Sequence, residues 1–210
     1  MLVKKYSDKK YGGSNTYICI NGKSAIIIDA GVCLDVFEKD LEGLTVKGVF
    51  ITHAHFDHIF YLESYLKKFN TDLYISDIGY QKLYDSYKNM SFWFKSQMEE
   101  EKDISDNEKS VYKEIVLTEK FQYIPLTDNT TFNLDDFVVT AIFTPGHSSD
   151  SYTFIIDKTA FVGDLIFANG VGRTDFYDGD SKALVDSIMK LKKFTNLRTI
   201  HSGHGESVKI

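Results

Sequence analysis

Apolar and polar residues alternate along the first quarter of the chain in the pattern of β-strands. The segments NTYICI (15–20) and KSAIIID (23–29) flank the dipeptide Asn21-Gly22. This dipeptide readily supplies the two positive φ angles of a type I′ turn, so we expect an antiparallel hairpin. A further strand is predicted at VKGVFIT (46–52), which is apolar enough to be buried on both faces.

After residue 56 the spacing of apolar residues becomes that of a helix. Intervals of three and four place one apolar stripe along a helix predicted from about residue 57 to 69, formed by Ile59, Leu62, Leu66 and Phe69. The segment DLYIS (72–76) is then predicted to return as a strand. Together these elements indicate a β-α-β unit.

The second half of the chain repeats this order. Strands are predicted at FVVTAIFT (137–144), SYTFIID (151–157) and TAFVGD (159–164), and LRTIHSGHG (197–205) indicates a strand followed by a loop. Before that last strand, a helix is expected from 181 to about 194, with Asp180 or Ser181 as its N-cap. The pattern predicts an α/β fold in which two sheets are sandwiched between helices, as a single domain over 1–210.

The middle segment, 78–124, has the least regular pattern. Residues 80–97 have a composition compatible with helix, and the charge-rich residues 98–110 are predicted to form an exposed connection. The aromatic triplet Phe92-Trp93-Phe94 is predicted to pack against the core, and the alternative is a lid over a site.

Composition limits the partners that we expect. The 210 residues carry a net charge of −6, which argues against nucleic-acid binding because such proteins usually present a basic stripe. No apolar run approaches the roughly 20 residues that cross a bilayer, and no signal peptide is recognised. Cys19 and Cys33 lack the spacing of a zinc ribbon or disulfide framework. We therefore expect a cytoplasmic protein with a small-molecule substrate, and the oligomeric state stays open.

The candidate chemistry is concentrated in THAHFDH (52–58), which holds three of the six histidines of the chain. Neutral imidazole and carboxylate are ligands for Zn²⁺ or Fe²⁺. His53 and His55 are two positions apart, whereas Asp57 and His58 are adjacent. The four side chains cannot all converge on one ion from a single strand face, so two ions, or one ion and partners, are favoured.

Three further polar residues follow predicted strands in the second half of the chain. These residues are His147, Asp164 and His204. The C-terminal ends of strands are where open α/β folds collect their ligands. We therefore predict that these three residues join the histidines of segment 52–58 in one site.

Four motifs carry a resemblance to a known family, namely THAHFDH, TPGHSSDS (144–151), VGD (162–164) and SGHG (202–205). Their order resembles that of the metallo-β-lactamase-fold metallohydrolases over nearly the whole chain. Within that superfamily the chain is most similar to the glyoxalase II (hydroxyacylglutathione hydrolase) branch, because of GDLIFANGVGRTDF (163–176) and YKNMS (87–91). The resemblance implies an αββα four-layer sandwich.

The resemblance also implies roles for individual residues. It implies two divalent metal ions, most readily zinc, with iron or manganese as alternatives. The first ion would be held by His53, His55 and His147, and the second by Asp57, His58 and His204, with Asp164 bridging them. Asp57 and Asp164 are the expected catalytic carboxylates.

Such a pair of ions lowers the pKa of water from about 15.7 towards 7, and the hydroxide between them would attack a carbonyl carbon. A thiolate leaves without a proton, so hydrolysis of a small acyl-thiol needs little beyond the metals. His201 is a spare histidine, expected to make a supporting or surface contact and otherwise to act as an acid. Metallohydrolases of the glyoxalase II branch have a basic residue that contacts glutathione, and Arg173 stands at that position. Its alternative role is a salt bridge with Asp175 or Asp178, and Tyr177 is a weaker substrate-binding candidate.

The chain departs from the family pattern in three places. Asp150 replaces a glycine and is expected to add a carboxylate near the metals, with an effect on charge or on loop conformation, and Ser202 replaces a proline. Because the chain ends at Ile210, the helical domain with which glyoxalase II enzymes hold glutathione is expected to be missing, so glutathione specificity is not implied.

Other functions stay open from the sequence. One is a persulfide dioxygenase, which shares the GRTDF loop and uses one Fe²⁺ bound by two histidines and an aspartate. Others are a lactonase or a nuclease of the tRNA-processing kind. A binding module without metal is disfavoured, since none of the seven ligands is lost.

Overall fold

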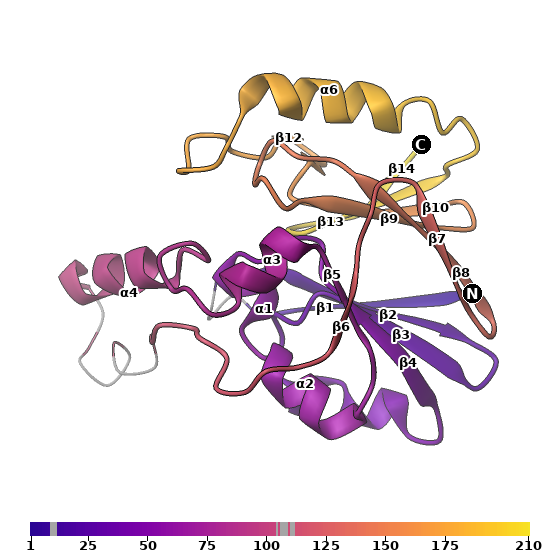
Figure 1. Ribbon diagram of the computed structural model, residues 1–210, viewed down its shortest axis with the longest axis horizontal. Helices are drawn as coiled ribbons and strands as arrows, with labels where there is room; N and C mark the ends of the chain where they lie inside the picture. The colour runs from indigo at the N-terminus through magenta and orange to yellow at the C-terminus, as the bar shows by residue number, and fades with distance from the viewer. Residues whose placement is uncertain (9–11, 104, 106–108, 110–111) are drawn as a thin grey trace.

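Two six-stranded sheets pack face to face, with helices on both outer faces (Figure 1). The computed structural model describes residues 1–8, 12–103, 105, 109 and 112–210. The strand order is β1-β2-β3-β4-β5-β6 in the first sheet and β14-β13-β10-β9-β8-β7 in the second. The predicted α/β four-layer sandwich is therefore confirmed.

The first sheet joins an antiparallel half to a parallel half. Pairing is antiparallel from β1 to β3 and parallel from β3 to β6. The strands are β1 (Leu2–Ser7), β2 (Asn15–Asn21), β3 (Ser24–Ile28), β4 (Thr45–Phe50), β5 (Leu73–Ile75) and β6 (Tyr123–Pro125). The other elements of this half are the 3₁₀ turns η2 (Leu34–Val36) and η3 (Glu38–Leu41) and the helices α1 (Phe56–Ile59), α2 (Leu62–Phe69), α3 (Asp77–Lys82) and α4 (Ser91–Glu100).

The second sheet is covered by one helix, α6 (Ser181–Leu191). Its predicted N-cap is confirmed, since the Asp180 carboxylate accepts hydrogen bonds from the amides of Lys182 and Ala183. The strands are β7 (Thr130–Leu134), β8 (Phe137–Phe143), β9 (Tyr152–Ile156), β10 (Thr159–Gly163), β13 (Thr199–Ser202) and β14 (Val208–Lys209). A small hairpin follows β10 and consists of β11 (Ile166–Phe167) and β12 (Gly170–Val171).

Three apolar clusters fill the three interfaces between the four layers. Strand alternation separates the first two, because Tyr17 and Cys19 of β2 pack between the sheets, while Ile18 packs towards α2. The third cluster lies between the second sheet and α6 and includes Leu184 and Leu191. The period of two in the sequence thus decides which side chains face which layer.

The hairpin between β2 and β3 has a different turn from the predicted one. Asn21 pairs with Ser24, so the two loop residues are Gly22 and Lys23. Gly22 has a φ of 57°, and neither Asn21 nor Lys23 has a positive φ. A single positive φ at the first loop residue is the pattern of a type II′ turn, which prefers glycine there. The type I′ prediction is therefore wrong, although the antiparallel pairing is confirmed.

The helix predicted over 57–69 is broken into α1 and α2. The carbonyl of His58 accepts a hydrogen bond from the amide of Ala30 at 2.7 Å, and the amide of Tyr61 donates to the carbonyl of Ala30 at 2.8 Å. The chain that follows β3 thus takes up backbone groups that a continuous helix would pair internally. This break could not be read from the apolar stripe, because the competing partner is about 30 positions away in the sequence.

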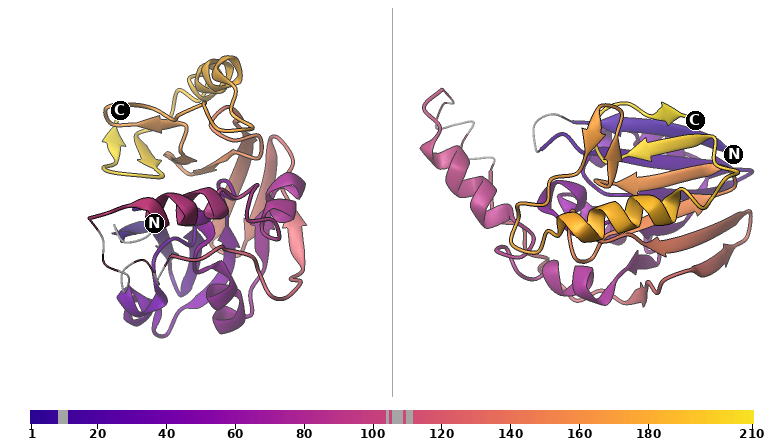
Figure 2. Two further views of the ribbon diagram at one scale, coloured as in Figure 1. Left: turned by 90° about the vertical axis from the view of Figure 1, so that its left-hand side faces the viewer. Right: turned by 90° about the horizontal axis from the view of Figure 1, so that it is seen from above.

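In the described part of the middle segment, α3 and α4 contain helical residues of 80–97, and α4 extends beyond the edges of both sheets (Figure 2). Trp93 is 54% exposed, so the prediction that the aromatic triplet packs against the core is wrong for this residue. Of the predicted charged connection, residues 98–100 belong to α4 and 101–103 are exposed. Residues 104, 106–108 and 110 of that connection lie outside the described residues.

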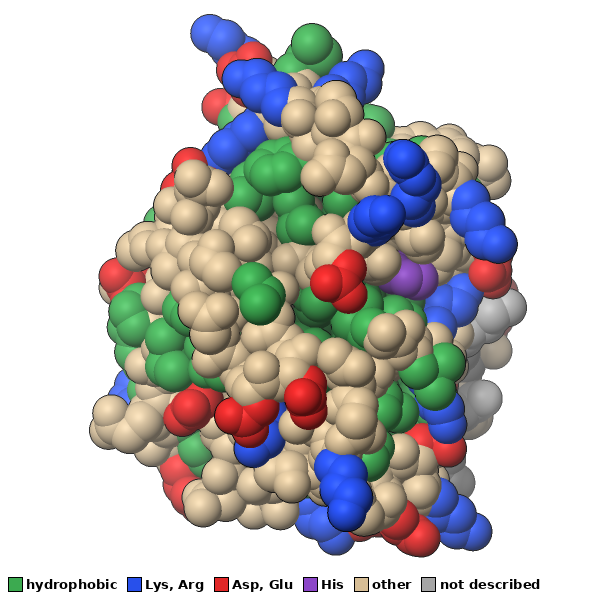
Figure 3. Space-filling view, turned by 90° about the vertical axis from the view of Figure 1, so that its right-hand side faces the viewer, with side chains coloured by type: hydrophobic (Ala, Val, Ile, Leu, Met, Phe, Trp, Pro, Cys, Tyr) green, Lys and Arg blue, Asp and Glu red, His purple; other side chains and the backbone are tan. Residues whose placement is uncertain are grey.

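The surface shown in Figure 3 has basic and acidic side chains interspersed among hydrophobic and polar ones. One ion pair of the exposed type joins Lys47 and Asp135 at 2.6 Å. In the described part of the chain, no helix combines the length and the apolarity that a membrane span requires.

Candidate metal centre

The seven residues predicted to form a site lie together, in helix α1 and in the loops that follow β4, β8, β10 and β13. They form three overlapping groups whose ligand atoms lie within 4.8 Å of one another. The groups are His53, His55 and His147; His53, His58 and Asp164; and Asp57, His58 and His204. The structure thus brings segments that are far apart in sequence together at this edge.

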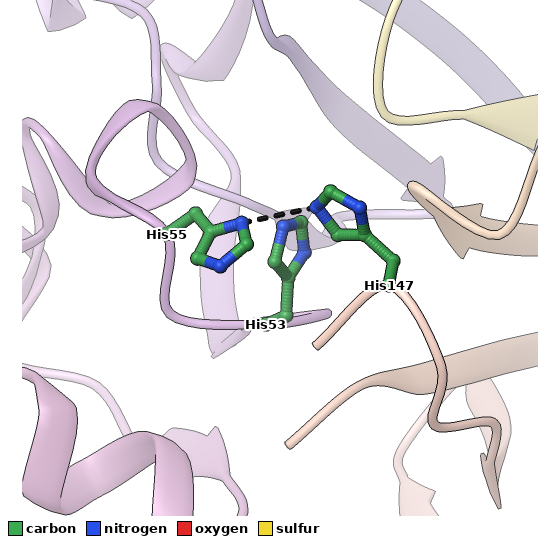
Figure 4. A group of neighbouring side chains, drawn as sticks. All are labelled: His53, His55 and His147. Atoms are coloured by element: carbon green, nitrogen blue, oxygen red, sulfur yellow. Dashed lines mark hydrogen bonds between the residues drawn. The ribbon is translucent and has the colours of Figure 1, made fainter. Parts of the chain in front are cut away.

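The first group consists of three histidines that face one another (Figure 4). The Nδ1 atom of His55 lies 3.0 Å from the Nε2 atom of His147, and the ring of His53 lies 4.7 Å and 4.9 Å from theirs. The other ring nitrogen of His147, Nδ1, donates to the carbonyl of Arg173 at 2.8 Å. This bond fixes the tautomer of His147 and leaves the lone pair of Nε2 directed towards the group.

The group of Asp57, His58 and His204 contains one carboxylate and lies beside a second one, that of Asp164. The Nε2 atom of His204 lies 3.1 Å from Asp57 Oδ2 and 3.4 Å from Asp164 Oδ2. Asp164 also approaches His58 Nε2 at 3.4 Å and His147 Nε2 at 3.5 Å. Its carboxylate therefore lies between the two groups, in the place that a shared ligand would take.

Sequence reasoning missed Asp29, which supports the metal centre through hydrogen bonds to His58 and Thr52. Its carboxylate accepts hydrogen bonds from His58 Nδ1 at 2.8 Å, from the Thr52 amide at 2.8 Å and from the Thr52 hydroxyl at 2.9 Å. The bond to Nδ1 orients the His58 ring with Nε2 towards the site. The sequence signal that could have identified Asp29 is its position directly after the apolar run AIII (25–28).

A cation fits these residues because several buried polar atoms have no partner. The Nε2 atoms of His53, His55 and His58 and the Oδ1 atom of Asp164 are buried without a hydrogen bond. Buried polar atoms are normally paired, since leaving one unpaired costs about 1–3 kcal/mol. Imidazole and carboxylate are the donors that zinc and iron bind, so the orphaned atoms and the donor set agree.

Burial and neighbouring charge set the protonation of the site. Burial lowers the pKa of His53 well below its usual value and lowers the pKa of His55 to about 4, so both rings are neutral. Burial opposes ionisation of Asp164, but His204 and His58 outweigh it and hold the pKa of that carboxyl well below its usual value. The pKa of His204 is raised to about 10, because its bonds to Asp164 and Asp57 outweigh burial. Neutral imidazoles and ionised carboxylates are the forms that bind metals, so a cation that binds at this site would displace the proton of His204.

Asp150, the predicted additional carboxylate, lies beside the ligand loops and is paired within the protein. Its Oδ2 atom accepts from the Ala54 amide at 2.8 Å, and its Oδ1 atom pairs with Lys82 Nζ at 2.6 Å. Lys82 also pairs with Asp178 at 2.6 Å and donates to the Ser148 hydroxyl at 2.6 Å. This buried cluster joins the loop of His53 and His55 to the loop of His147.

The remaining sequence candidates occupy different surroundings. Arg173 lines the cavity described below and pairs with Asp175 at 2.7 Å, as the alternative prediction had it. Tyr177 does not line that cavity, and its hydroxyl donates to the Lys88 carbonyl at 3.1 Å. His201 packs its ring on Tyr17 and Phe161, away from the seven residues.

Ser202, the second departure from the family pattern, forms hydrogen bonds that connect β13 to neighbouring elements. Its hydroxyl donates to the Ile166 carbonyl at 2.6 Å, which ties β13 to the small hairpin. Its carbonyl accepts from Asn15 and Tyr17 of the first sheet.

A cavity of about 790 Å³ opens directly above the two groups. Five of the seven residues form its floor, namely His55, Asp57, His147, Asp164 and His204. The walls come from α1, the start of α4, the β11–β12 hairpin and residues 173–176. The fold and this site together define an α/β protein with a histidine–aspartate centre at the edge of two stacked sheets.

Comparison with known proteins identifies the family. The model of the Metallo-beta-lactamase superfamily matches residues 10–204, so the chain belongs to that superfamily. The chain is 32% identical to "Probable metallo-hydrolase MJ0888" of Methanocaldococcus jannaschii, over 93% of this chain and 90% of that one. It is 28% identical to "Hydroxyacylglutathione hydrolase GloC" of Haemophilus influenzae, over 87% and 81% of the two chains. The crystal structure of BLEG-1 B3 metallo-beta-lactamase superposes with a TM-score of 0.83 at 26% identity, covering 99% of this chain and 94% of that one.

Proposed function

We propose that this protein is a metal-dependent hydrolase that cleaves thioesters with two divalent cations bound at the candidate metal centre. The observation that carries the proposal is the set of three buried ring nitrogens and one carboxylate oxygen without partners, at the floor of a cavity or directly behind it. Membership of the superfamily and the hydrolase names of MJ0888 and GloC support hydrolysis.

Each residue has a proposed part in holding the ions. His53, His55 and His147 hold the first cation, Asp57, His58 and His204 hold the second, and Asp164 is shared. Bound cations would supply Lewis acidity and lower the pKa of water from about 15.7 towards 7. Zinc suits this donor set, and iron or manganese are the alternatives.

The lining of the cavity supports a thioester as substrate. No serine, threonine or cysteine is among the described residues that line it, so water is the proposed nucleophile. No lysine or tyrosine is present in that lining, its histidines are proposed metal ligands, and its one carboxylate outside the metal centre, Glu206, pairs with Lys5 at 2.9 Å, so none of them is placed to protonate a leaving group. A thiolate leaves without such a proton, whereas an amine requires one.

The test measures metal content and thiol release on the same preparation. We expect about two metal ions per chain by elemental analysis and thiol release from small acyl-thiols. Asp57→Asn should lose one metal and most of the thiol release, whereas Asp35→Asn, a matched change at an exposed position, should keep both. Full metal loading without hydrolysis of any thioester would refute the proposal.

A persulfide dioxygenase is the second candidate function. One of the three groups contains two histidines and one carboxylate, His53, His58 and Asp164, which is the donor set of many mononuclear non-haem iron sites. Iron as the isolated metal, together with oxygen uptake on addition of glutathione persulfide, would favour this function over thioester hydrolysis.

A further inference from the structure

We propose that the cavity selects substrates whose acyl group is uncharged and apolar, either aryl or medium-chain alkyl. The inference rests on the proposed thioester hydrolase function and names the substrate class of that same site. Two observations carry it, namely an apolar wall that begins at the metal-centre histidines and the absence of a free cation in the described lining.

Six large apolar side chains form the wall, namely Phe56, Met90, Trp93, Phe94, Phe167 and Phe176. Phe56 and Phe94 stack with ring centroids 4.3 Å apart and planes at 22°. Phe176 meets the rings of His55 and His147 edge-on at 5.3 Å and 5.6 Å. An acyl group whose carbonyl carbon lies at the floor would therefore rest against aromatic faces, which bind flat or flexible apolar groups well.

The start of α4 supplies the part of the wall that is open to solvent. Trp93 exposes 54% of its surface, so a bound apolar group would cover area that is now in contact with water. Met90 precedes α4 with a φ of 70°, in the left-handed region that non-glycine residues seldom adopt. Such backbone positions cluster at binding sites, and a methionine adapts its shape to different apolar groups.

The charged residues of the lining are already paired. Arg173 is the only lysine or arginine among the described lining residues, and its Nε and Nη2 atoms donate to Asp175 at 2.9 Å and 2.7 Å. Glu206 pairs with Lys5 at 2.9 Å, and the other two carboxylates belong to the metal centre. The carboxylates of glutathione, or the phosphates of a coenzyme A carrier, would find no unpaired cation there.

The first experiment varies the acyl group on one neutral thiol, N-acetylcysteamine. We expect kcat/KM to rise from acetyl to hexanoyl by up to about fourfold per methylene, the change that full burial of one CH₂ produces. The hexanoyl thioesters of glutathione and coenzyme A should show no higher kcat/KM than the hexanoyl thioester of the neutral carrier. Trp93→Ala should reduce the hexanoyl-to-acetyl ratio several-fold, and Met189→Ala, an exposed change on α6, should leave the ratio unchanged.

The second experiment detects binding without catalysis. Trp93 is the single tryptophan of the chain, so its fluorescence reports on the cavity directly. Titration with 4-phenylbutanoate should give a saturable blue shift, and the same concentrations of acetate should give none. Phe94→Ala keeps the reporter and should weaken the binding of 4-phenylbutanoate.

The outcomes separate this inference from the proposed function. Thiol release that is independent of acyl length, or faster from the charged carriers, would overturn the inference and leave thioester hydrolysis standing. Failure to hydrolyse any thioester with metals bound would refute the proposed function. In that case the fluorescence titration still decides the inference, because a saturable shift supports the apolar preference and no shift overturns it.

Discussion

Replacing Lys82 with methionine tests the cluster that joins the loops of the metal centre. Its ammonium group lies 2.6 Å from Asp150 Oδ1 and 2.6 Å from Asp178 Oδ2, and its side chain is 2% exposed. Methionine preserves most of the side-chain volume and removes the charge. Two carboxylates then face each other in a buried position with no cation between them.

The expected loss follows from the burial of the pair. Breaking a buried ion pair by removing one partner costs about 3–5 kcal/mol, because the remaining charge is left uncompensated. In a chain of this size 1 kcal/mol shifts the melting temperature by roughly 2–4 °C, so the melting temperature should fall by about 6–20 °C. Lys67→Met is the matched control, since Lys67 pairs with Glu63 at 2.7 Å on the surface and should contribute no more than about 1 kcal/mol.

The stability lost in Lys82→Met should be larger at neutral pH than at acidic pH. Burial opposes ionisation of Asp178, but Lys82 outweighs it and lowers the pKa of that carboxyl to about 2. A lowered carboxyl pKa contributes stability above the unfolded value of about 3.9, and this stability is lost as the pH falls towards 2. The difference between the wild type and Lys82→Met should therefore be largest near neutral pH and shrink below about pH 4.

The assay is urea unfolding at pH 7 and pH 3.5, with a chelator present so that bound metal does not contribute to stability. The free energy of unfolding should fall by several kcal/mol at pH 7 for Lys82→Met and by less than about 1 kcal/mol for Lys67→Met. Equal losses in the two variants, or a loss that grows on acidification, would refute the reasoning.

Three further changes test the metal centre itself. Asp29→Asn removes the carboxylate that orients His58, and metal affinity in a chelator competition should fall by about 10–100-fold; unchanged affinity would contradict that role. Gly203→Ala places a Cβ atom 2.0 Å from Asp164 Oδ1, so metal content should drop, whereas Gly170→Ala has no neighbour within 4 Å and should retain it. Removing metal with a chelator should lower the free energy of unfolding by about 2.7 kcal/mol, when the protein is compared with a sample that contains free metal at 100 times its Kd. An unchanged melting curve would argue against a bound ion.

The strands and the family could be predicted from the sequence because their signals are local. Alternation in segments such as NTYICI decides which side chain faces which layer, and the order of the histidine motifs is characteristic of the family. The broken helix could not be predicted in the same way. Its break depends on hydrogen bonds to Ala30, a partner that the fold supplies.

The site was predicted as a set of ligands but not as a supported structure. The roles of Asp29 and Lys82 were missed, because a lone acid or base in a sequence usually lies at the surface. Asp150 was expected to add a carboxylate near the metals, but the sequence could not show that its oxygens are directed to Lys82 and Ala54. Direction of a side chain is not encoded by distance along the chain.

By itself the sequence determined the residue types of the centre and the strand ends that carry them, since strand alternation and metal-ligand chemistry act over a few residues. Only the tertiary structure decided that Asp29 and Lys82 support the residues of the centre and that α4 places Trp93 in the cavity wall. The reason is physical. These relations depend on how layers pack and which distant backbone groups pair, and such contacts exist only once the chain has folded.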